Sequence, residues 1–153
     1  MKGRSILVDG QPLGKRFWGP ISGTPLPGLI MMVTAATEPV VGDFQYQEAS
    51  VGADGKKAVP YVLVEDRPQG RTVDDAYVSG TMGDIYVLLP GDDFNGRLGE
   101  GAGTSNTGAI GDPYMLDSDS GTLIPWTTGE VFAILMETIT TVAASTLCYF
   151  RKT

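Results

Sequence analysis

The sequence predicts an all-β fold, either a compact β-barrel or a jelly-roll-like sandwich, with an extended N-terminal arm. Glycine and proline supply 21 and 10 of the 153 residues, an excess typical of chains in which many turns join short extended pieces. Turn signals also recur roughly every ten residues between short apolar runs, as they do in small sandwiches and barrels. A chain of this length normally forms one domain and can bury a sizeable core.

Residues 1–27 are predicted to form the arm, and residues 28–153 the β-rich domain. Glycines and prolines alternate along the arm, so neither a helix nor a central strand can run through it. Residues 1–20 carry a net charge of +3, whereas residues 21–153 carry −10. A basic arm on an acidic body is typical of an ordinary solvated terminus, and the alternative is a contact role.

Two adjacent aromatic residues, Phe17 and Trp18, lie in this arm, which has no core of its own. They either fold back onto the parent domain or anchor the arm to a neighbouring molecule, because aromatic and arginine side chains are enriched in the centres of interfaces. The candidate contact residues are the basic and aromatic side chains of the arm: Lys2, Arg4, Lys15, Arg16, Phe17 and Trp18.

Strands are predicted wherever a short apolar run ends at turn residues. Two of these runs flank an acidic turn that ends in Gly121, which is the pattern of a β-hairpin. The last third of the chain is the most apolar part and contributes three further runs. In chain order the predicted strands occupy residues 28–34, 59–65, 84–89, 114–116, 122–124, 130–137, 138–142 and 146–150.

The run 130–137 is the one place where a helix competes with a strand. Thr127 and Glu130 have the spacing of a capping box, and the run contains good helix formers. The apolar part is only six residues long, however, and continues directly into β-branched residues. Length and composition therefore favour a strand.

The composition removes most of the familiar catalytic chemistry. The chain has no histidine, so no imidazole can act as a base or hold zinc. Cys148 is the only cysteine and lies in an apolar run, which predicts a buried thiol and excludes an intramolecular disulfide. No set of residues supplies a nucleophile, a base and an orienting group together. We therefore expect no enzymatic activity, no cofactor and no metal.

Three stretches resemble ligand-binding motifs, but each departs from its motif at a required position. Residues 10–16 are one residue short of a phosphate-binding loop and lack its Ser/Thr. Residues 99–103 lack the third glycine of a dinucleotide site. In residues 117–121 the glycine comes one place too early for a calcium loop.

Two pairs of adjacent carboxylates are also candidates for acid–base chemistry or for binding a hard cation. They are Asp74 with Asp75 and Asp92 with Asp93. Neighbouring acids on a strand or turn point in different directions, so both pairs are predicted to be solvated loop ends.

Charge and hydropathy also limit the partners. The formal net charge of −7 predicts a surface that repels phosphates and hence no nucleic-acid partner. No stretch approaches the roughly 20 apolar residues of a membrane span, and no signal peptide is recognisable. A membrane partner is therefore not expected.

One ordered set of features resembles the small head-decoration, or capsid cement, proteins of tailed bacteriophages. The likeness covers roughly residues 24–152 and lies in the order of turns and strands. Its features are Thr24-Pro25-Leu26-Pro27-Gly28 before an apolar strand, Asp74-Asp75-Ala76-Tyr77 with Gly80 behind it, Tyr86 to Asp92, Leu98, the glycine-rich stretch to Ile110-Gly111-Asp112, Met115-Leu116, the acidic turn to Gly121-Thr122-Leu123, Val131 to Glu137, and a closing strand.

This resemblance implies a β-rich protein of the virion that is made in the host cytoplasm and binds the outer surface of the assembled capsid. Its partners would be the major capsid protein and itself, commonly as a trimer at local three-fold positions. Such a protein would stabilise the shell because it binds only the assembled state. Its arm could reach a neighbouring subunit by adding a strand to an exposed sheet edge.

Other functions remain open at this stage. A fibre or adhesion module of the virion would bind a host surface glycan through the polar loop at residues 99–111. A small β-barrel enzyme would have to rely on aspartate and tyrosine alone. The glycine-rich loop itself can equally be a long surface connection without a special role.

Overall fold

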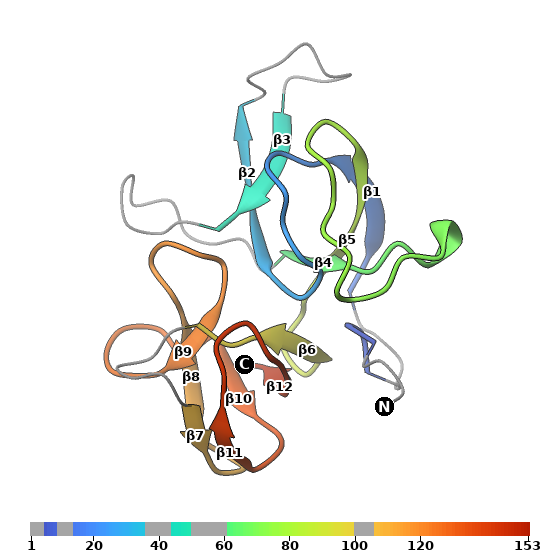
Figure 1. The fold of residues 1–153 in the computed structure, drawn as a ribbon. Coiled ribbons are helices and arrows are strands. Elements are labelled where there is room, and N and C mark those ends of the chain that lie inside the picture. The colour runs from blue at the N-terminus through green and yellow to red at the C-terminus, as the bar shows by residue number, and fades with distance from the viewer. Residues whose placement is uncertain (1–4, 9–13, 36–43, 50–60, 100–105) are drawn as a thin grey trace.

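The computed structural model describes residues 5–8, 14–35, 44–49, 61–99 and 106–153, and it confirms the predicted all-β class. Figure 1 shows two groups of strands, the first half of the chain above the second. Within the described ranges the only helical element is η1, a single 3₁₀ turn (Arg67–Gln69). No helix in these ranges has the length and apolar character needed to cross a membrane.

The first sheet is antiparallel and curls until its two outer strands meet. Its order is β1-β5-β4-β2-β3. Ile21, just after β1, forms a parallel bridge with Tyr46 of β3, and the backbone N–H of Ser22 donates to the Tyr46 carbonyl at 2.8 Å. The strands are β1 (Arg16–Pro20), β2 (Ile30–Ala35), β3 (Phe44–Glu48), β4 (Tyr61–Val64) and β5 (Met82–Val87).

The second sheet, in the order β6-β12-β10-β8-β9, closes on itself in the same way. Leu98, just after β6, forms a parallel bridge with Leu123, and Gly99 N–H donates to the Leu123 carbonyl at 2.8 Å. The remaining two strands, β7 and β11, pair with each other. The strands of this half are β6 (Asp93–Arg97), β7 (Asn106–Gly108), β8 (Pro113–Leu116), β9 (Leu123–Pro125), β10 (Ala133–Leu135), β11 (Ile139–Val142) and β12 (Leu147–Lys152).

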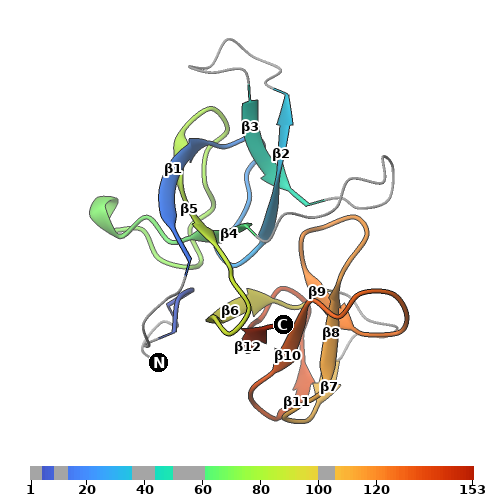
Figure 2. The same ribbon diagram turned by 180° about the vertical axis from the view of Figure 1, so that it is seen from behind.

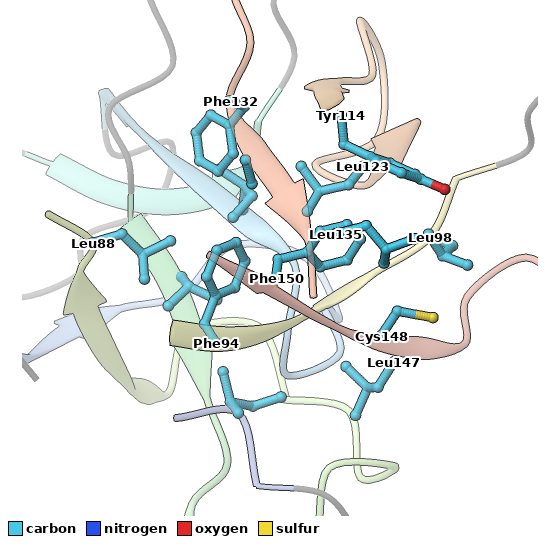
Figure 3. Close-up of a cluster of buried hydrophobic side chains, with 14 of the residues drawn as sticks. Leu88, Phe94, Leu98, Tyr114, Leu123, Phe132, Leu135, Leu147, Cys148 and Phe150 are labelled. Carbon is cyan, nitrogen blue, oxygen red and sulfur yellow. The ribbon is translucent and has the colours of Figure 1, made fainter. Parts of the chain in front are cut away.

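The two sheets share one core, which makes the fold sandwich-like. Side chains alternate along β4: Val62 and Val64 join the core shared with the second sheet, and Leu63 joins a smaller core inside the curl of the first. In the shared core (Figure 3) the Phe150 ring packs on those of Phe94 and Tyr114, with centroids 6.0 and 5.1 Å apart. The first sheet therefore contributes side chains to a core on each of its faces.

Among the strands β1–β12, the chain completes the first sheet before it begins the second. This order differs from the jelly-roll-like arrangement, in which Greek-key connections carry strands from one sheet to the other. Among the strands β1–β12, the turn through Gly91 between β5 and β6 is where the chain passes from the first sheet to the second. Of the nine neighbouring pairs among the described strands, three are consecutive in the chain: β2–β3, β4–β5 and β8–β9.

The strand favoured over a helix after Trp126 is confirmed. Residues 133–135 form β10, which pairs with β8 and β12. The β-branched continuation forms β11. Cys148 is buried as predicted, with 2% of its surface exposed.

The prediction that the acid pair at residues 92 and 93 is a solvated loop end is wrong for Asp92. Only 4% of Asp92 is exposed. Its carboxylate accepts hydrogen bonds from the Tyr86 hydroxyl at 2.9 Å and from Leu89 N–H at 2.8 Å. The acid is buried because it caps the β5–β6 turn, a role that sequence adjacency does not reveal.

Two buried tyrosines should titrate late. Burial raises the pKa of both Tyr77 and Tyr86 to about 12. The Tyr77 hydroxyl donates to the Val64 carbonyl at 2.8 Å, and Tyr86 donates to Asp92. Because the unfolded pKa is about 10, their stabilisation is complete below about pH 10 and is lost as the pH rises from about 10 to 12.

A tyrosinate absorbance titration of the folded protein measures this directly. We expect absorbance to continue rising up to the alkaline unfolding transition, and Tyr86→Phe should remove part of that late rise. If all six tyrosines ionised together near pH 10 with native circular dichroism, the assignment of Tyr77 and Tyr86 would be wrong.

Candidate interaction surface

The predicted contact residues that the structure describes lie on or beside β1, an outer strand of the first sheet. Val87 N–H donates to the Lys15 carbonyl and Ile21 N–H to the Thr81 carbonyl, so odd-numbered residues bond to β5. Arg16 and Trp18 direct their backbone groups toward the other edge of the strand. The backbone bridge to β3 lies just beyond the C-terminal end of β1, at Ile21.

Phe17 folds back onto the parent domain, which was one of the two alternatives. Its ring packs on Tyr46 and Tyr61 with centroids 5.7 and 5.8 Å apart. Tyr46 and Tyr61 are themselves 5.5 Å apart in a T-shaped arrangement. Phe17 therefore closes the open end of the smaller core, and the structure uses it for packing.

Arg16 forms an ion pair with a completely buried carboxylate. Its Nε lies 2.8 and 2.7 Å from the two carboxylate oxygens of Asp84, and Nη2 also contacts that group. Asp84 has no exposed surface, whereas about half of the Arg16 side chain is exposed. Hydrogen bonding to Asp84 raises the pKa of Arg16. The Arg16 guanidinium thus covers the buried Asp84 carboxylate on one side and is exposed on the other.

Trp18 turns outward and is the exposed aromatic residue of this strand. It lies opposite Asp84 in the register, diagonal to Met82 of β5 on the same face. Trp18 and Met82 are 46% and 49% exposed, whereas Tyr86 on the same face is 1% exposed. The face of the β1–β5 pair that carries Tyr86 packs on the second sheet at that end. At the other end of the pair, where Trp18 and Met82 lie, the same face is exposed. We call Arg16, Trp18 and Met82 the β1 surface.

The other predicted contact residues are placed as follows. Lys15 is exposed, directly before β1. Lys2 and Arg4 lie outside the described residues. β1 is hydrogen-bonded into the sheet, so the second half of the segment 1–27 lies on the domain in this structure. It is an outer strand, in agreement with the glycine and proline content that argued against a central one.

A second N-terminal contact was missed from the sequence. Residues 5–8 run along β6, where Leu7 lies opposite Phe94. Ile6 is completely buried in the shared core. Figure 2 shows this segment in blue beside β6. The apolar triplet Ile6-Leu7-Val8 was the available signal, but its position within a glycine- and proline-rich segment obscured it.

Part of the loop proposed for glycan binding forms a β-strand. Residues 100–105 lie outside the described residues, and Asn106–Gly108 forms β7 against β11. The Asn106 side-chain amide donates to the carbonyls of Gly99 and Val142 at 3.2 and 3.4 Å. The Asn106 carboxamide is therefore used in hydrogen bonds within the domain. The interpretation of residues 99–111 as one long connection is wrong where β7 forms.

The described ranges contain no group of three or more metal-ligating side chains. In the acidic turn, Ser120 Oγ donates to Asp117 at 2.6 Å, and Gly121 occupies a left-handed conformation with φ of 61°. β8 and β9 flank this turn in antiparallel register. It is the predicted hairpin.

The comparisons with known proteins support the fold. No family model matches the sequence, and no curated protein matches it. Among solved structures, the head fiber gp8.5 N base of bacteriophage phi29 resembles this chain with a TM-score of 0.56. The two are 11% identical, and the match covers 92% of this chain and 95% of the other. Nearly the whole chain therefore shares the architecture of that base.

Proposed function

We propose that this protein is a head-decoration, or cement, protein of a tailed bacteriophage. It binds the major capsid protein on the outer surface of the assembled head as a homotrimer at local three-fold positions. The observation that carries this proposal is the fold likeness to a phage head fiber base over 92% of the chain. The resemblance of the sequence to decoration proteins points in the same direction, independently of that structure.

The proposed role needs binding energy and no chemistry. A protein that binds the shell but not its free subunits stabilises the shell by mass action. Three linked copies convert weak individual contacts into avidity when all three engage together. The proposal accordingly includes no enzymatic activity, no cofactor, no metal, and neither a nucleic-acid nor a membrane partner.

The β1 surface is the proposed contact with the capsid. Tryptophan and arginine are the side chains that most often dominate interface energies, and here they lie together with Met82. Removing residues 1–20 would test this contact poorly, because it would delete both buried Ile6 and β1. Point substitutions of exposed residues separate binding from folding.

We expect Trp18→Ala to weaken binding to expanded capsids by about tenfold or more, because a central tryptophan commonly contributes about 2 kcal/mol. Trp126→Ala is the matched control, since Trp126 is 42% exposed beside the second sheet. Sedimentation of capsids with labelled protein gives the affinity, and circular dichroism verifies folding. Unchanged binding by Trp18→Ala would remove the β1 surface from the capsid contact.

The second candidate is the base of a virion fibre or adhesion module that binds a host glycan. The fold likeness favours it, because the similar phage structure is itself a head fiber base. Electron microscopy of particles with bound protein separates the two candidates. Repeated density over the shell supports decoration, whereas capsid-independent binding to host cells and a glycan array supports adhesion.

A further inference from the structure

Residues 5–8 occupy the edge of β6 as an added strand. Asn95 N–H donates to the Ile6 carbonyl at 2.7 Å, and Val8 N–H donates to the Asp93 carbonyl at 3.3 Å. These two bonds flank the Leu7–Phe94 pair, as in an antiparallel ladder. The outer edge of the second sheet is thus covered by a short segment from the start of the chain.

The edge has the features of a built binding site for an extended peptide. Two buried polar side chains contact the backbone or hydroxyl of the segment. Glu65, 3% exposed, accepts hydrogen bonds from Ser5 Oγ at 2.8 Å and Ile6 N–H at 3.1 Å. Asn95, 6% exposed, donates from its side chain to the Ser5 carbonyl at 2.6 Å. Ile6 fills the adjoining core.

The hydrogen bonds that hold the segment come from distant parts of the sequence. Glu65 lies 59 residues from Ile6, and Asn95 lies 90 residues from Ser5. The same segment from another copy of the chain would meet the same groups, so exchange between copies preserves every contact. Residues 1–13, which precede β1, carry a net charge of +1, and residues 14–153 carry −8, so opposite charge favours the approach of one copy's N-terminus to another copy's body.

We propose that the β6 edge is a strand-acceptor site, and that in the assembled protein it holds residues 5–8 of a second copy. The exchanged strands would link neighbouring copies through main-chain hydrogen bonds and a buried isoleucine. This inference rests on the self-association included in the proposed function. Beyond self-association, the inference specifies the exchanged segment, residues 5–8, and its binding site, the β6 edge of the other copy.

Disulfide trapping between differently mutated chains tests the exchange. Val8 lies opposite Asp93 when the Leu7–Phe94 register is extended by one residue, where Cα atoms are about 5.5 Å apart. That separation lies within the usual range of disulfides, about 4.4–6.8 Å. One chain carries Val8→Cys and the other Asp93→Cys with a mass tag. Both carry Cys148→Ala, so no other thiol is present.

The two full-length chains are unfolded together, refolded, and oxidised, and the products are separated under non-reducing conditions. We expect the mixed disulfide to form several-fold more than in a control that pairs Val8→Cys with Ser118→Cys, an exposed turn position. A yield no higher than in that control overturns the exchange. The double variant Val8→Cys/Asp93→Cys should then close within single chains.

Light scattering on the same samples separates the two proposals. Trimers without the mixed disulfide would retain the proposed self-association and overturn the exchange alone. Monomers at all concentrations, with no mixed disulfide, would overturn both. Trimers in which the mixed disulfide predominates would support both.

Discussion

Replacing Arg97 with methionine should lower the free energy of unfolding by about 3–5 kcal/mol, the cost of breaking a buried network of charged hydrogen bonds. Arg97 is 4% exposed. Its guanidinium donates to the carbonyls of Pro27 at 2.7 Å and Ser145 at 2.6 Å, and also to that of Val73. Methionine fills a similar volume but leaves these three carbonyls without their donor.

The loss should exceed that of a surface arginine in the same sheet. Arg151 pairs with Asp93 at 2.7 Å but is half exposed, so Arg151→Met should lower the free energy of unfolding far less than Arg97→Met. Urea unfolding of both variants compares the two directly. If Arg97→Met and Arg151→Met proved equally stable, Arg97 would not join the loops that hold its acceptors, and the sheets would be stabilised by apolar packing alone.

Apolar alternation and turn chemistry were enough to predict much of the fold. The runs at 28–34, 84–89 and the hairpin around Gly121 correspond to β2, β5 and the β8–β9 pair. Each combines residues that suit a pleated, half-buried surface with a turn that ends the strand. These signals are local, so the sequence contains them in full.

Strand β6 shows why other elements could not be predicted. Its residues Asp93–Arg97 include only one large apolar side chain, yet Asn95 and Arg97 are both buried. Their burial depends on acceptors contributed from the N-terminus and from loops far away in sequence. A polar strand stabilised by long-range hydrogen bonds has no period of its own to detect.

The role of a glycine in the predicted arm could not be deduced from local sequence either. The glycine content predicts that Gly19 belongs to an extended arm, but a Cβ there would lie 2.3 Å from the Tyr46 ring. The residue permits close packing of β1 against β3 at the point where the sheet closes. Composition alone cannot distinguish a glycine needed for close approach from one needed for freedom of the chain.

Arg16→Met should lower the free energy of unfolding by about 2–4 kcal/mol, because it leaves the charge of Asp84 buried without its partner. The value falls below that for Arg97 because half of the Arg16 side chain is exposed and water can reach the vacated space. Lys15→Met is the matched control: the residue is adjacent and exposed, and we expect a change within about 0.5 kcal/mol. Thermal and urea unfolding supply both values.

The double variant Arg16→Met/Asp84→Leu separates the structural role of Arg16 from its proposed contact with the capsid. With no charge left in the interior, most of the lost stability should return. If the double variant is stable but binds capsids weakly, Arg16 contributes to the interface directly. If it binds as well as the parent protein, the arginine serves only Asp84, and Trp18 with Met82 must supply the contact. A double variant as unstable as Arg16→Met alone would contradict the ion-pair argument itself.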